Sequence, residues 1–171
     1  MLESAFRPIG LVLIAALVAW GLARPLWASE EVRETIGAWI LECGKTEAGG
    51  RGCEIRNDEG GKAALEQSRL FQIILHQGKT EADGLVRVTD LELKPRLPVE
   101  IAYGGGRREF EGVGRRGRLA VRFNLQKQEL GGLAAGESIT VRFADKADTP
   151  QEIEFPTAGL AEALAKADGF L

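Results

Sequence analysis

Cys43 and Cys53 are the only two cysteines of the chain, and they lie ten positions apart in the stretch ILECGKTEAGGRGCEIRN. A cysteine pair can bind a metal, exchange thiols or form a structural disulfide. A structural zinc site needs about four ligands, whereas the chain offers these two cysteines and one histidine, His76. A thioredoxin-like redox pair has only two residues between its cysteines. The longer, glycine-rich spacing favours a structural disulfide across a hairpin, and we expect neither a metal site nor a cofactor.

His76 is the only candidate for an imidazole base. A nucleophilic triad also needs a nucleophile and an orienting group within hydrogen-bond reach. The three serines of residues 29–171 are Ser29, Ser68 and Ser138, and none lies in a GxSxG elbow. We therefore interpret His76 as an edge or core residue at the end of an apolar strand and expect no catalytic residues. An envelope hydrolase remains an alternative, and it would require a pocket that joins His76 to a carboxylate and a hydroxyl.

A cluster of arginines is the strongest surface feature of the sequence. Five fall within twelve residues and are opposed there by two glutamates: Arg107, Arg108, Arg115, Arg116 and Arg118, against Glu109 and Glu111. Arginine forks match phosphate and carboxylate groups. The cluster indicates a patch for an anionic ligand, such as lipid or polysaccharide of a Gram-negative envelope. The alternative is a solvated hairpin whose charges keep a sheet edge from pairing.

The first residues have the pattern of an export signal. Arg7 precedes an uncharged, mostly aliphatic run from Ile9 to Ala23. A bilayer-spanning helix needs about 20 apolar residues, whereas the apolar core of a signal peptide has about 7–15. We predict a signal peptide over residues 1–28, cleaved after Ala28 or after Ala23, with an uncleaved anchor as the alternative. Both interpretations place the rest of the chain in the periplasm or at the outer surface, where disulfides persist.

Residues 29–171 have the length of a single domain. The formal net charge of the chain is −3, which argues against a nucleic-acid partner because such proteins carry a basic footprint. Trp39, Leu41 and Cys43 recur at the two-residue period of a strand, and Trp39 is the only tryptophan after residue 28. We therefore expect Trp39 in the core beside Cys43.

Short strands separated by turn residues follow along the rest of the chain. We expect a strand buried on both faces within residues 62–77, a polar turn over residues 79–84, an interruption at Pro95 and Pro98 and a hairpin tip at residues 104–106. We expect a short helix within residues 125–136 and a final helix over residues 157–169, with Thr157 as its N-cap and Gly169 as the glycine that ends it. The prediction is a mainly β fold, an antiparallel β-sandwich or barrel-like domain with a short C-terminal α-helix, preceded by an N-terminal signal or anchor helix.

These residues together resemble the invasion-associated locus B family. The resemblance rests on the order of GAWILEC, CEIRN and ESITVRFAD…EIEFPTAGLAEALA, which places matching residues at Trp39, Cys43, Cys53, Val141, Phe143, Phe155, Gly159 and Leu164. It implies a small, exported, mainly β protein without catalytic residues, in a family named for a member linked to host-cell invasion. Many members carry a second cysteine pair after the glycine hairpin, where this chain has GVGRRGRL.

The resulting functional expectation is an exported, non-enzymatic β domain that acts by binding. Its partner would be a protein, lipid or glycan of the cell envelope or of a host surface. A membrane-anchored accessory or assembly subunit of an envelope complex is the alternative, favoured if the N-terminal segment stays uncleaved.

Overall fold

The computed structural model describes residues 31–47, 49–59 and 69–171. The expected signal or anchor segment therefore lies outside the described residues. Within the described ranges, no helix combines the length and the apolar character that a membrane crossing requires. The strands and helices are β1 (Val32–Ile36), β2 (Trp39–Lys45), β3 (Arg51–Glu59), β4 (Arg69–His76), β5 (Glu81–Thr89), β6 (Arg96–Tyr103), β7 (Gly106–Arg115), β8 (Arg118–Gln126), α2 (Lys127–Ala134), β9 (Ser138–Ala144), β10 (Pro150–Pro156) and α3 (Leu160–Phe170).

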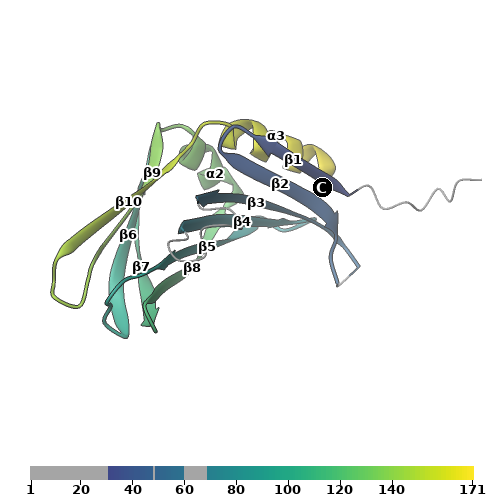
Figure 1. The fold of residues 1–171 in the computed structure, drawn as a ribbon. Coiled ribbons are helices and arrows are strands. Elements are labelled where there is room, and N and C mark those ends of the chain that lie inside the picture. Colours follow the sequence, from purple (N-terminus) through teal and green to yellow (C-terminus); the bar gives the residue numbers. More distant parts are fainter. Residues whose placement is uncertain (1–30, 48, 60–68) are drawn as a thin grey trace, which may run out of the picture.

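The ten strands of the described residues form one sheet, in the order β1-β2-β3-β4-β5-β8-β7-β6-β9-β10, and every neighbouring pair is antiparallel. The sheet curls so that β6, β9 and β10 face the strands β1 to β5 across the interior, as a half-barrel (Figure 1). The sandwich alternative is wrong, because there is a single hydrogen-bonded sheet. The barrel-like alternative is correct in an open form, with β1 and β10 as the two edges.

The core lies on the concave face of this sheet, where most strands place buried apolar side chains in alternation with more exposed residues on the other face. Trp39 is fully buried, and its Nε1 donates a hydrogen bond of 3.0 Å to the Pro156 carbonyl oxygen. The ring of Phe71 on β4 lies 6.0 Å from that of Trp39 on β2 and 5.4 Å from that of Phe155 on β10. These edge-to-face contacts join strands from opposite ends of the sheet.

The two edges of the sheet meet at one point, which we call the glycine seam: Gly37 in the β1–β2 turn and Gly159 before α3. The Ala38 amide donates a hydrogen bond of 3.0 Å to the Ala158 carbonyl oxygen. Gly37 has a φ of +59° and Gly159 a φ of +90°, in the left-handed region that favours glycine. A Cβ atom at Gly159 would lie 2.2 Å from the Ile36 carbonyl oxygen, so the close approach also requires glycine.

The helices α2 and α3 cover one end of the half-barrel (Figure 1). Leu160, Ala163 and Ala167 of α3 are buried against β2 and β3. Two expectations for the last helix were wrong. Thr157 does not cap it, because its hydroxyl donates to the Gly136 carbonyl oxygen and Gly159 is the N-cap residue. Gly169 lies within α3, which runs to Phe170.

Three expectations for the strands also need correction. β4 is not buried on both faces, because Phe71 and Ile73 are buried while Ile74 on the other face is only half-buried. β5 begins at Glu81, inside the predicted polar turn. Pro98 lies within β6 and does not end it.

Candidate functional site

The disulfide predicted from the cysteine spacing is present. Cys43 on β2 and Cys53 on β3 are directly paired across the two strands, with their Cα atoms 4.1 Å apart. Both side chains are buried on the concave face, and the Cys53 Sγ atom lies 3.8 Å from the Ala167 carbonyl oxygen of α3. The disulfide therefore fixes the β2–β3 hairpin at the place where the C-terminal helix packs against it.

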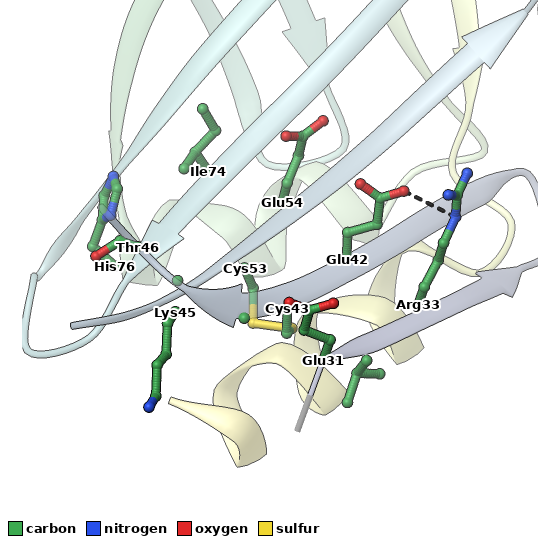
Figure 2. Close-up of a pocket in the computed structure, with 13 residues that line it drawn as sticks. Glu31, Arg33, Glu42, Cys43, Lys45, Thr46, Cys53, Glu54, Ile74 and His76 are labelled. Carbon is green, nitrogen blue, oxygen red and sulfur yellow. Dashed lines mark ion pairs between the residues drawn. A yellow bond between two sulfur atoms is a disulfide. The ribbon is translucent and has the colours of Figure 1, made fainter. Parts of the chain in front are cut away.

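A hollow of about 400 Å³ opens on the other side of the same two strands (Figure 2). Its floor lacks side chains because Gly44 pairs with Gly52. Polar and charged side chains stand around it: Glu31, Arg33, Glu42, Lys45, Thr46, Glu54 and His76. A Cβ atom at Gly52 would lie 2.8 Å from the Thr46 Cγ2 atom, so a larger residue there would fill part of the hollow.

Two of the carboxylates at this hollow are compensated by arginines. Arg56 contacts Glu42 and Glu54 at 3.0 Å each, and the Arg33 Nε atom lies 3.0 Å from Glu42. Burial by itself would lower the pKa of Arg56, but its hydrogen bonds to Glu54 and Glu42 raise it above the ordinary value. Glu42 and Glu54 therefore serve this network, which leaves Glu31 and Lys45 as the charged groups at the rim.

His76 lies at this hollow, at the end of β4 on the convex face. Its Nε2 atom is 3.5 Å from an Asp83 carboxylate oxygen. The nearby Thr46 hydroxyl donates a hydrogen bond of 3.2 Å to the Gly50 carbonyl oxygen. His76 and Thr46 both line the hollow, whereas Asp83 contacts His76 from outside its lining, and the Thr46 hydroxyl is directed to the backbone and not to the imidazole. Among the described residues, no three His, Cys, Asp or Glu side chains gather as a metal site.

A second hollow, of about 670 Å³, lies between α2 and α3. Leu75, Leu130 and Leu164 contribute apolar walls, and Lys127 and Asp168 form an ion pair of 3.2 Å at its border. Its volume is in the range of small-ligand pockets.

The five arginines expected as one patch are divided between the two ends of β7. Arg107 and Arg108 follow the β6–β7 hairpin tip, whereas Arg115 is the last residue of the strand. Seven residues of extended chain, at about 3.3 Å per residue, separate Arg108 from Arg115 by about 23 Å. Arg108 also lies on the concave face, where its Nη1 atom is 3.2 Å from Glu129 of α2 and its guanidinium lies over the Phe110 ring.

The turn between β7 and β8 instead belongs to a different arginine cluster on the convex face. Arg115 pairs with Arg118, and Arg118 pairs with Thr89 of β5. Arg87 on β5, Arg96 on β6 and Arg122 on β8 project from the same face. All members of the cluster are exposed. We define the outer arginine surface as Arg87, Arg96, Arg115, Arg116, Arg118 and Arg122.

Sequence reasoning missed Arg87, Arg96 and Arg122. β5 pairs with β8 and not with the next strand along the chain, so residues far apart in sequence become neighbours. The alternation of Arg118 and Arg122 with buried Leu119 and Val121 was a local signal that these two arginines share a face. Nothing local places Arg87 beside them.

Comparison with known proteins supports the fold. No family model and no curated protein matches the sequence. The structure is similar to that of invasion associated protein B from Bartonella henselae. The TM-score is 0.64 with 19% sequence identity, over 81% of this chain and 95% of the other. This likeness agrees with the fold implied by the resemblance to the invasion-associated locus B family, and at this identity it speaks for the fold alone.

Proposed function

We propose that this chain is an exported, non-enzymatic β domain that acts by binding in the periplasm or at the outer surface of a Gram-negative cell. The observation that carries the proposal is the Cys43–Cys53 disulfide, built into a fold like that of invasion associated protein B. Such disulfides persist in oxidising compartments. The apolar N-terminal segment of the sequence supports export independently.

The distribution of charge supports binding over catalysis. At the hollow beside the disulfide, Glu42 and Glu54 are neutralised by arginines. On the outer arginine surface, by contrast, several guanidinium groups face solvent. A rigid sheet that presents uncompensated charge is suited to hold a partner of opposite charge. The partner class is an anionic component of the envelope or of a host surface.

Fractionation of the native cell tests the proposal. We expect the protein in the periplasmic or surface fraction, with no thiol open to alkylation before reduction and with an N-terminus at Arg24 or Ser29. An intact N-terminus in the inner-membrane fraction would favour the anchored accessory subunit. Recovery from the cytosol with two free thiols would contradict export in either form.

An envelope hydrolase is the second candidate, favoured by the His76–Asp83 contact beside Thr46. For the Thr46 hydroxyl to act as nucleophile, it would have to leave the Gly50 carbonyl oxygen and reach the imidazole. The test compares the parent with His76→Gln and Thr46→Val on a panel of ester and peptide substrates. We expect equal, background rates. Turnover by the parent that both substitutions abolish would establish the hydrolase instead.

A further inference from the structure

We propose that the outer arginine surface docks on an anionic lipid bilayer and binds the phosphate groups of its headgroups. This inference rests on the proposed function for its location in the cell, where such a membrane surface is available. The binding itself follows from the geometry of β5, β6, β7 and β8. It can therefore fail or succeed independently of export.

The first argument is the uncompensated charge of this surface. Arg96 contacts Glu111 at 3.6 Å, and among the side chains that the structure describes no carboxylate forms an ion pair with the other five arginines. Asp90, just beyond β5, is a further acidic residue at this end of the sheet. The whole chain carries a formal net charge of −3. The positive surface is therefore a local concentration of charge and not a consequence of composition.

The second argument is that folding alone disfavours this arrangement. Arg115 and Arg118 are directly opposite each other on neighbouring strands, and like charges in that position are destabilising. Arg116 between them has a φ of +51°, where glycine or asparagine is favoured. A turn that had only to connect two strands would be more stable with other residues. Local conflicts of this kind are expected where residues serve a function.

The exposed side chain of Val113 distinguishes between two anionic partners, a lipid bilayer and a polyanionic glycan. It is 49% exposed on the same convex face, two residues before Arg115, and its cross-strand neighbours are Arg96 and Ala120. A bilayer surface offers phosphates and, just beneath them, an apolar boundary that accepts such a side chain beside arginine stems. A polyanionic glycan offers the charge but no partner for the valine. The combination therefore favours a lipid surface.

Vesicle sedimentation tests the proposal with the full protein as isolated. Vesicles of phosphatidylglycerol and phosphatidylcholine are the probe. Vesicles of phosphatidylcholine alone measure the binding that does not depend on lipid charge, including any binding through the apolar N-terminal segment. The test variant is Arg115→Ser/Arg118→Ser. The matched control, Lys79→Ser/Arg107→Ser, removes the same charge from the β4–β5 turn and from the other end of β7, where both residues are exposed.

We expect the parent to partition onto anionic vesicles and to dissociate as salt is raised. The Arg115→Ser/Arg118→Ser variant should lose about 30-fold in partition coefficient, because each basic residue near an anionic membrane contributes about fivefold. The control should lose much less. Val113→Ser should weaken binding to vesicles and leave binding to heparin unchanged.

The folding of the test variant is checked by its thermal midpoint, which should be equal to or above that of the parent because a like-charge pair is removed. If it does not fold, Arg87→Ser/Arg122→Ser on β5 and β8 provides the same test. Equal vesicle binding by parent and test variant, or equal loss in test and control variants, would overturn the proposal. So would binding to heparin without binding to anionic vesicles. A cytosolic location combined with tight vesicle binding would reject the proposed compartment and leave the docking surface standing.

Discussion

The carboxylate of Asp145 accepts several hydrogen bonds in the turn between β9 and β10. Its Oδ1 atom accepts hydrogen bonds of 2.9 Å from the backbone amides of Ala147 and Thr149, and its Oδ2 atom accepts one of 3.1 Å from the Gln151 side chain. The hydrogen bond from the Thr149 amide is the main cause of the lowered pKa of Asp145. Desolvation acts in the opposite direction, and the hydrogen bond from the Ala147 amide lowers the pKa further. The ionised carboxylate is therefore the form that holds this turn.

A pH-dependent contribution to stability follows from this lowered pKa. The folded state favours the ionised carboxylate. The stabilisation is therefore complete at pH values above 3.8, the ordinary pKa of an aspartate, and is lost as the pH falls from there through the lowered pKa of Asp145 in the folded state. We expect Asp145→Asn to unfold at lower temperature than the parent at neutral pH, and the difference to vanish in acid. Thermal unfolding followed by circular dichroism measures both. A difference that persists unchanged at the lowest pH would show that the charge of Asp145 is not the cause.

At the scale of elements, the disulfide, β2, β3 and α3 form one unit. The cysteines join β2 to β3, and Cys53 lies against Ala167 of α3. The chain between the cysteines is short, so the chain-entropy model gives a stabilisation of about 2–3 kcal/mol. The hairpin should persist without the bond, because β3 also pairs with β4 along its whole length.

Cys43→Ala/Cys53→Ala should therefore remain folded and lose about 2–3 kcal/mol in free energy of unfolding. Urea denaturation monitored by circular dichroism measures this loss. A reducing agent should lower the stability of the parent by a similar amount and leave the double variant unchanged. A double variant as stable as the oxidised parent would mean that the β3–β4 pairing alone fixes the hairpin.

The elements also show what could be predicted from the sequence. β2, β8 and β9 were predictable because their apolar residues alternate at the period of a half-buried strand. The start of β5 was not, because Glu81–Gly84 has poor strand propensity and is extended through its pairing with β8. The outer arginine surface depends on the same non-local pairing. The disulfide was predictable because both of its residues lie within one hairpin.

At the scale of the whole molecule, the half-barrel stays open along most of its two edges and is joined at the glycine seam. The Ala38–Ala158 hydrogen bond lies there, and the Trp39 side chain reaches Pro156 beside it. Since the concave face holds the core, the seam keeps the two halves of the curved sheet packed on each other. Its two glycines should therefore matter more for stability than glycines elsewhere with the same backbone conformation.

Gly159→Ala tests this, with Gly78→Ala as the matched control. Both positions have a positive φ, +90° and +72°, but a Cβ atom at Gly78 has no neighbour within 4 Å, whereas one at Gly159 would lie 2.2 Å from the Ile36 carbonyl oxygen. The control variant Gly78→Ala should lose only the about 1–2 kcal/mol that a left-handed backbone conformation costs a residue with a Cβ atom. Gly159→Ala should lose about 3 kcal/mol or more in free energy of unfolding, because the β1–β2 turn must also move away. Its tryptophan emission should shift to longer wavelength as Trp39 becomes solvated. Equal losses in the two variants would mean that the edges of the half-barrel can separate without disturbing the core.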